Sequence, residues 1–87
     1  LTEGVLPAPP GVRERLAAAR RHLELVIQER GESRGIREMR KHLAWYLKGL
    51  PGAAGMRARI MTAGTRTAVL ELLEGYERTL AEKGWIT

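Results

Sequence analysis

The chain has 87 residues, a net charge of +5 and no cysteine. This length supports one domain at most, and the lack of cysteine excludes disulfides, thiolate metal sites and a cysteine nucleophile. No apolar run approaches the roughly 20 residues that span a bilayer, and no secretory signal pattern opens the chain. We therefore expect a cytoplasmic protein and, because the chain begins at Leu1, a fragment of a longer one.

The composition favours helices throughout the chain. Phe, Asn and Asp are absent, whereas Ala, Leu, Arg and Glu are abundant. These four residues are strong helix formers. The β-branched residues that favour strands are scattered singly. The expected fold class is therefore all-α.

The first predicted elements are a linker and a helix. Residues 1–11 are rich in Pro and lack periodicity, which is typical of a linker from a missing upstream domain. Residues 12–30 repeat apolar side chains at three- and four-residue steps, which predicts a helix with one apolar stripe. The stripe comprises Val12, Leu16, Ala19, Leu23, Val26 and Ile27. Gly31 is expected to end this helix.

Three further helices complete the predicted fold. Ser33 is the expected N-cap of a helix over 34–48, and Met56 and Ile60 are the expected inward pair of a shorter helix over 53–63. Thr65 is expected to cap a helix over 66–83, within which Gly75 would allow a neighbouring helix to approach closely. Residues 12–87 should then form a small antiparallel four-helix bundle.

Gly84 is expected to end the last helix and to let Trp85 fold back onto Leu80. A hydrophobic contact of this kind often accompanies a glycine that closes a helix.

The positive charge is concentrated in the middle third of the chain. Residues 34–66 hold eight Lys or Arg residues against Glu38 alone, a local charge of +7, whereas residues 67–87 hold four Glu against two cations, a charge of −2. Such a local positive field attracts anionic partners.

The predicted helix over 34–48 has two faces. A wheel at 100° per residue places its apolar residues on one arc and its cations on the opposite arc. We predict an RNA-binding surface from these cations, extended by the next helix; its residues are Arg34, Arg37, Arg40, Lys41, Lys48, Arg57 and Arg59, with Arg66 as a further extension. Phosphate contacts of this kind give affinity without sequence discrimination.

Trp45 lies among these cations rather than on the apolar arc. One interpretation is that its ring stacks on a sugar or an exposed base. The other, favoured for Trp45 taken alone, is that it packs against another helix or a missing domain. We include Trp45 with the candidate RNA-binding residues.

Other kinds of site find no support in the sequence. His22 and His42 lack the Cys or Asp partners that a metal site would use, so no metal site is predicted. The glycines of "KGLPGAAG" follow Lys48 rather than precede it, which excludes a P-loop. No catalytic constellation is present, so we predict no catalytic residue in this chain.

The segment "RGIREMRKHLAWYLKGLPGAAGMRARI", residues 34–60, resembles the C-terminal helical domain of bacterial tRNA-dihydrouridine synthases, closest to the B-type branch. The resemblance rests on Arg40-Lys41-His42, two residues, then Trp45-Tyr46-Leu47-Lys48-Gly49. It extends to the earlier "RRHLEL" and "GESRG" and to the Pro-rich start, and it is weak after residue 64.

This resemblance implies a function for the longer protein. In the family, an FMN-binding (β/α)₈ barrel reduces a D-loop uridine of tRNA with NADPH, and a barrel cysteine is the proton donor. The helical domain positions the tRNA, which makes Arg40, Lys41 and Lys48 candidate tRNA contacts, extended by Arg34 and Arg37. The resemblance further implies that this fragment alone has no reductase activity and no flavin, and that its partners are tRNA and the missing barrel.

Two other functions remain open at this stage. A basic helical module could dock an acidic protein surface and be indifferent to RNA. A DNA-binding helix-turn-helix is the weaker alternative, because "KGLPGAAG" is a poor turn for that motif.

Overall fold

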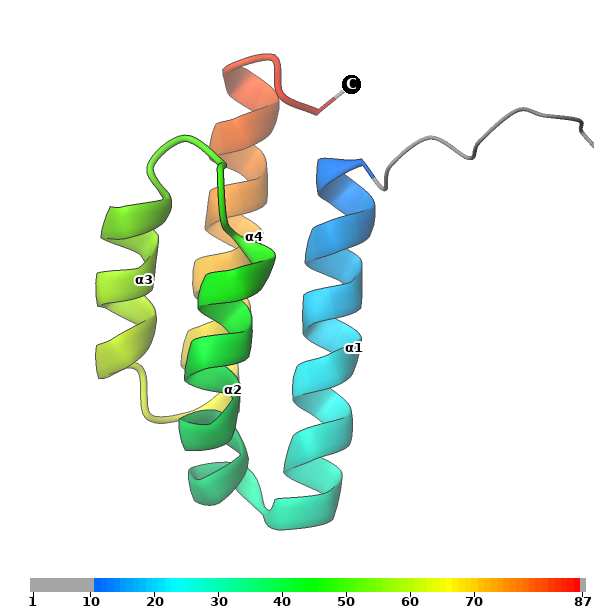
Figure 1. The fold of residues 1–87 in the computed structure, drawn as a ribbon, viewed down its shortest axis with the longest axis vertical. Coiled ribbons are helices and arrows are strands. Elements are labelled where there is room, and N and C mark those ends of the chain that lie inside the picture. The colour runs from blue at the N-terminus through cyan, green and yellow to red at the C-terminus, as the bar shows by residue number, and fades with distance from the viewer. Residues whose placement is uncertain (1–10, 87) are drawn as a thin grey trace, which may run out of the picture.

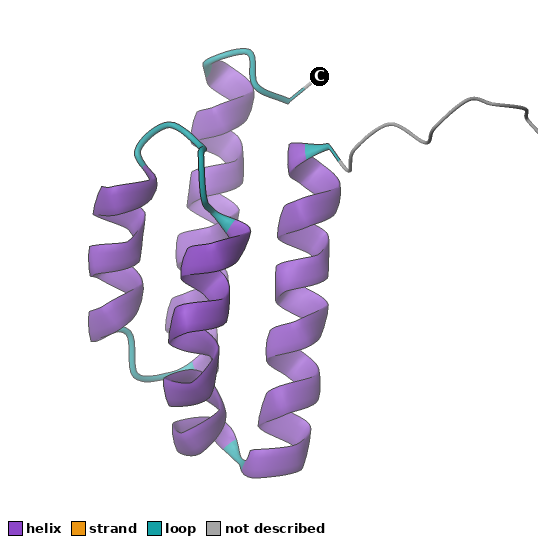
Figure 2. Cartoon of the chain, in the orientation of Figure 1, coloured by secondary structure: helices purple, strands orange, loops and turns teal. Residues whose placement is uncertain are grey.

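The structure, a computed structural model, describes residues 11–86 and contains only helices and connecting loops in that range (Figure 1, Figure 2). The helices are α1 (Val12–Arg30), α2 (Glu32–Tyr46), α3 (Ala53–Thr62) and α4 (Arg66–Glu82). The predicted all-α class is confirmed. The predicted linker lies outside the described residues apart from Gly11.

The four helices stand side by side around one core. In the view of Figure 1, α2 lies at the front between α1 and α3, α4 lies behind, and successive helices run in opposite directions. α1 contacts α2 and α4, and α3 contacts the same two helices. One face of α2 therefore looks inward and the opposite face looks out between α1 and α3.

The core is formed by the apolar stripes that the periodicity predicts. Every helix contributes fully or almost fully buried side chains; they include Leu16, Ala19, Leu23, Ile36, Met39, Leu43, Met56, Ile60, Val69, Leu73, Tyr76 and Leu80. Among residues 11–86 no polar or charged residue is buried. Burial at roughly 25 cal/mol per Å² of apolar surface therefore supplies most of the favourable free energy of this fold.

The turn between α1 and α2 is tighter than predicted. Gly31 has φ +87°, and its amide donates to the Ile27 carbonyl at 2.7 Å. Its carbonyl also accepts from the Gly35 amide at 2.9 Å, so α2 begins at Glu32 and no side chain caps it. The prediction of Ser33 as N-cap is therefore wrong, because one glycine both closes α1 and opens α2.

The close helix approach occurs at Gly35 rather than at Gly75. A Cβ added to Gly35 would lie 2.9 Å from the Ile27 Cα, and Gly35 is buried. A Cβ added to Gly75 would meet only the tip of Arg78, at 4.0 Å. The role predicted for Gly75 is therefore wrong. The α1–α2 turn needs the small residue, because it brings the two backbones together.

The ends of α4 agree with the sequence. The Thr65 hydroxyl accepts from the Ala68 amide at 3.1 Å, which confirms the predicted cap. At the other end Gly84 has φ +85°, and the Trp85 amide donates to the Leu80 carbonyl at 2.9 Å. This is the bonding of a glycine-closed helix end, although the Trp85 side chain remains 50% exposed.

α2 ends at Tyr46, two residues before the predicted end. Arg15 on α1 bonds the freed carbonyls there: its Nη2 donates to the Tyr46 oxygen at 2.5 Å and to the Lys48 oxygen at 2.9 Å. A guanidinium at a helix C-terminus supplies donors to unpaired carbonyls and a charge that complements the helix dipole. Arg15 thereby fixes the end of α2 against α1.

Candidate nucleic-acid interface

The outward face of α2 and the turn that follows it carry a set of cations, which we call the cationic ridge: Arg34, Arg37 and Lys41 on α2, and Lys48 two residues beyond its end. Arg37, Lys41 and Lys48 are exposed, and none of them forms an ion pair with any residue in the range 11–86. Their charge is therefore not neutralised by an adjacent carboxylate within the described chain. This arrangement produces a positive potential along the ridge.

Arg34 differs from the rest of the ridge because it pairs with Glu38, which Arg30 also contacts. Its Nε lies 3.5 Å from Glu38, and the Arg30 Nε lies 3.7 Å from the same carboxylate. Exposed pairs of this kind are worth about 0 to 1 kcal/mol and are easily exchanged for another anion. Arg34 is thus a weaker candidate for a phosphate contact than Arg37 or Lys41.

Arg40 has a structural role between two helices. Its Nη2 donates to the Ala63 carbonyl just beyond α3 at 3.2 Å, and its Nε is buried without a hydrogen-bond partner. The side chain as a whole is only partly exposed. Arg40 therefore links α2 to the end of α3 and presents only part of its guanidinium to the solvent.

A hollow between α2 and α3 brings one of the two arginines predicted to extend the ridge, Arg57, next to it. Arg57 on α3 lines this hollow together with Arg37, Arg40 and Lys41 on α2. Arg59 instead lines a different groove, between α3 and α4. Of the extension predicted from the sequence, the structure brings Arg57 to the ridge and places Arg59 elsewhere, because the two side chains leave α3 in different directions.

Arg66, the last cation of the middle third, is engaged with acids of the α1–α2 segment. Its Nε donates to Glu24 Oε1 at 2.6 Å, its Nη2 donates to the other carboxylate oxygen, and its backbone amide donates to Glu32 at 2.7 Å. The hydrogen bond from Arg66 holds the pKa of Glu24 below its usual value, and the same bond raises the pKa of Arg66. Arg66 does not extend the ridge.

Trp45 is 70% exposed beside the ridge. It lines a hollow between α1 and the end of α2, which we call the aromatic hollow: Glu14, Arg15, Ala18, Trp45, Tyr46 and Lys48. The Trp45 and Tyr46 rings meet edge to face, with centroids 5.8 Å apart. Sequence reasoning missed Arg15 here, because it lies 30 positions from Trp45 in the sequence and no local pattern links the two.

Two histidines continue this line of rings along α1 and α2. The His22 Nδ1 lies 3.3 Å from the Tyr46 hydroxyl, and the His22 and His42 ring centroids are 4.9 Å apart. The part of the chain that the structure describes holds no cluster of three or more His, Cys, Asp or Glu able to bind a metal ion. The histidines are thus neighbours of the aromatic hollow.

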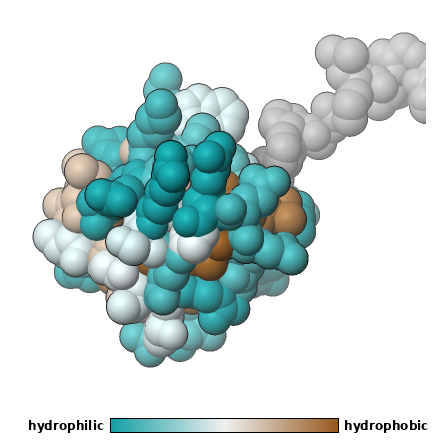
Figure 3. Space-filling model, turned by 90° about the horizontal axis from the view of Figure 1, so that it is seen from below, coloured by the Kyte–Doolittle hydropathy of each residue, from teal (hydrophilic) through white to brown (hydrophobic). Residues whose placement is uncertain are grey.

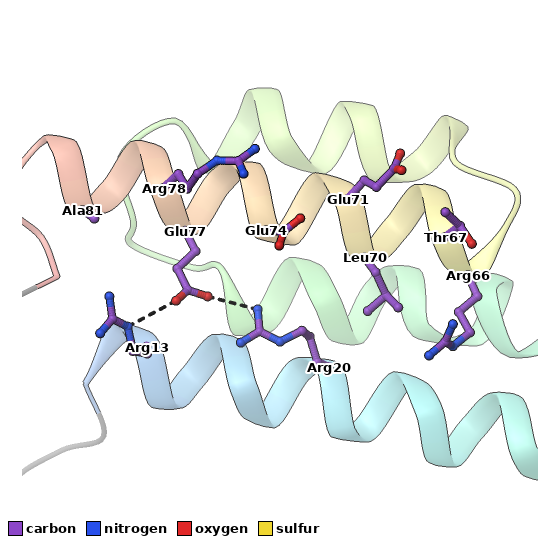
Figure 4. Close-up of a pocket in the computed structure, with 10 residues that line it drawn as sticks. All are labelled: Arg13, Arg20, Arg66, Thr67, Leu70, Glu71, Glu74, Glu77, Arg78 and Ala81. Carbon is purple, nitrogen blue, oxygen red and sulfur yellow. Dashed lines mark hydrogen bonds and ion pairs between the residues drawn. The ribbon is translucent and has the colours of Figure 1, made fainter.

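The α4 side of the bundle has the opposite electrostatic character. Figure 4 shows Glu77 on α4 between Arg13 and Arg20 on α1, with Glu71 and Glu74 on the same helix. The Glu77 carboxylate accepts from Arg13 at 3.2 Å and from Arg20 at 3.1 Å. Arg13 and Arg20 on this side are thus engaged by an acid, and Glu71 and Glu74 add negative charge, so this side is less positive than the side of α2 and α3.

Viewed from the end where α1 leads into α2, hydrophilic side chains cover most of the molecule, with small hydrophobic patches between them (Figure 3). Within residues 11–86, no helix has the length and apolar content needed to cross a membrane.

The fold and the ridge define a small helical module with an exposed basic face. Residues 1–82 match the family model described as dihydrouridine synthase. Because this match spans most of the chain, the chain belongs to the dihydrouridine synthase family.

Curated relatives agree with this family. A probable tRNA-dihydrouridine synthase of Mycobacterium leprae is 39% identical over 72 residues, covering 79% of this chain and 19% of that protein. The tRNA-dihydrouridine synthase B of Xanthomonas campestris pv. campestris is 39% identical over 79 residues, covering 87% and 23%. The chain thus spans about a fifth of the relatives it matches. No solved structure matches it.

Proposed function

We propose that this chain is the tRNA-recognition domain of a tRNA-dihydrouridine synthase and forms its C-terminal helical part. In this proposal the domain holds tRNA so that a D-loop uridine reaches a catalytic (β/α)₈ barrel outside the chain. The B-type branch is the proposed subgroup, and the similarity to the Xanthomonas synthase B supports that choice. The proposed domain has no catalytic residue of its own.

The observation that carries the proposal is the set of cations without an ion pair on the outward face of α2 and in the turn just after it. Arg37, Lys41 and Lys48 have no acidic partner within residues 11–86, and Arg57 lies across the same hollow as two residues of the ridge. Lys and Arg that neutralise phosphates release counterions, which supplies affinity for any polyanion. RNA-modifying enzymes must also extrude their target base, so a separate domain that grips the RNA is useful to them.

The proposed RNA contacts differ in strength according to how many hydrogen-bond donors each side chain has free and where it lies on the surface. Arg37, Lys41, Lys48 and Arg57 would contact phosphates directly. Arg34 and Arg40 flank them, with part of their donors already used. Arg59 would contact RNA only where the strand passes around α3.

FMN and NADPH are the cofactors that the family resemblance implies. The described residues do not fit a flavin, because the buried side chains of this bundle are apolar except for Tyr76, whose hydroxyl already donates to the Pro51 carbonyl. We therefore assign both cofactors to the part of the synthase outside this chain and derive no redox step here.

The test is a titration of the chain with unmodified tRNA at several salt concentrations. For Z neutralised phosphates, the slope of log affinity against log salt is roughly −0.7Z to −0.9Z. Lys41→Ala and Lys48→Ala should each weaken binding and each reduce Z by about one. Both side chains are exposed, so neither change should affect folding.

Arg78→Ala is the matched control. Arg78 is exposed on α4, next to the acidic residues of that helix (Figure 4), and its substitution removes the same unit of charge from the opposite side. The salt slope of this variant should equal that of the unchanged chain. A slope near zero, or an equal effect of all three substitutions, would contradict the proposal and favour the alternative of a protein-docking module.

A further inference from the structure

The aromatic hollow exposes a large ring that the fold does not use. Trp45 is 70% exposed, and α2 contributes Ile36, Met39 and Leu43, not Trp45, to the core. Its neighbour Tyr46 is partly buried and packs against the core, and the two rings meet at 74°. Tyr46 therefore contacts the indole from one side, and most of the Trp45 side chain remains open to the solvent.

Two cations lie at the same hollow. Arg15 lines it from α1, and its position is fixed by bonds from Nη2 to the carbonyls of Tyr46 and Lys48. Lys48 lines it from the end of α2 and is exposed. Glu14 is the one acid there, and its carboxylate folds back towards Gly11 at the start of α1.

We propose that the aromatic hollow takes one unpaired base of a bound RNA, stacked on Trp45, with the adjoining phosphate held by Lys48 and Arg15. This inference rests on the proposed function. It adds a second kind of contact, which recognises an unstacked nucleotide rather than backbone charge.

The chemistry of the hollow favours a single-stranded nucleotide. Every base has a flat face that can stack on an indole, and such stacking tolerates any sequence. Bases within an RNA duplex are already stacked on one another, so only unpaired ones can use the site. The hollow adjoins the cationic ridge at Lys48, so a strand that follows the ridge would bring its next base to Trp45.

The experiment compares two RNA probes on the same protein. The probes are a short single-stranded oligouridylate and an RNA duplex of equal length, each titrated against the unchanged chain and its variants at one fixed salt concentration. Trp45→Ala should weaken binding of the single strand about tenfold, within the range for loss of one stacked base, and leave duplex binding within about twofold. Trp45→Phe should keep most of the affinity, whereas Trp45→Leu should not, because leucine is apolar but cannot stack.

Trp85 provides the matched control, since it is the other tryptophan and is 50% exposed away from this hollow. Trp85→Ala should change neither affinity. Trp85→Phe leaves Trp45 as the sole tryptophan, and its fluorescence should be quenched by the single strand and much less by the duplex. Circular dichroism of each variant should show unchanged helix content.

The outcomes separate this inference from the proposed function. If Lys41→Ala weakens binding but Trp45→Ala leaves single-strand binding unchanged, the hollow takes no base, and only this inference is overturned. If Trp45→Leu binds the single strand as well as Trp45→Phe does, the hollow is an apolar docking surface and the inference is again overturned. If the unchanged chain binds neither probe nor tRNA, both proposals are overturned.

Discussion

The contact between Gly35 and Ile27 makes a sharp prediction about stability. Gly35→Ala places a Cβ 2.9 Å from the Ile27 Cα and 3.1 Å from the Ile27 amide nitrogen. Carbon atoms that do not share a bond prefer about 3.5 to 4.0 Å. The obstacle is backbone, so the two helices must move apart at their turn.

The magnitude follows from two opposing effects. Alanine in place of glycine inside a helix stabilises by about 1 kcal/mol, and overpacking a close contact costs about 1 to 3 kcal/mol. Gly35→Ala should therefore lower the free energy of unfolding by about 0 to 2 kcal/mol. Gly75→Ala is the matched control, because its Cβ would meet only Arg78 at 4.0 Å and should stabilise by up to about 1 kcal/mol.

Thermal unfolding followed by far-UV circular dichroism measures the difference. For a domain of this size 1 kcal/mol corresponds to roughly 4 to 8 °C. Because the gain from replacing glycine is common to both variants, they differ by the overpacking cost of about 1 to 3 kcal/mol. Gly75→Ala should therefore unfold at least about 4 °C above Gly35→Ala. If Gly35→Ala is as stable as Gly75→Ala, or more so, the close approach of α1 and α2 at their turn is not present in solution and the reasoning fails.

Two further substitutions each remove one hydrogen bond, and the second also removes an ionisable group, the Tyr76 hydroxyl. Thr65→Ala removes the cap of α4 and should lower stability by about 1 kcal/mol in urea unfolding, whereas Thr65→Ser should retain it; equal loss in both would show that the hydroxyl does not cap the helix. Tyr76→Phe removes the bond from the hydroxyl to the Pro51 carbonyl, at 2.6 Å, and should cost about 1 kcal/mol at neutral pH. Burial raises the pKa of Tyr76 above its usual 10.0, so above about pH 10 the unfolded chain loses this proton before the folded chain does, and stability falls as pH rises. Tyr76→Phe should lack that part of the decline, and parallel profiles above pH 10 would contradict this assignment.

The predicted helices were recovered because their signals are local. The apolar stripes, Gly31 and the Thr65 cap each act within one or two turns, so their effect does not depend on the other helices. The exception is Ser33, which has the right chemistry for an N-cap. Its role was taken by Gly31, since the tight turn leaves only this residue between the two helices.

The candidate site was only partly visible in the sequence. Periodicity alone placed Lys41 and Lys48 opposite the apolar face of α2, and both are exposed. Whether a cation meets an acid from another helix is a tertiary property. Arg66 looked equivalent to Arg57, yet Arg66 is bonded to Glu24 on α1, whereas Arg57 lies beside the ridge.

The sequence by itself determined that this chain is helical, that α2 has an apolar and a cationic face, and to which family it belongs. The helical repeat and the residue types carry that information without reference to the rest of the molecule. Only the tertiary structure decided which side chains meet across helices: Arg15 at Trp45, Gly35 at Ile27, and Arg59 away from Arg57. The physical reason is that the rotation and spacing of each helix are set by how the buried side chains of all four helices interlock in one core, which no local pattern specifies.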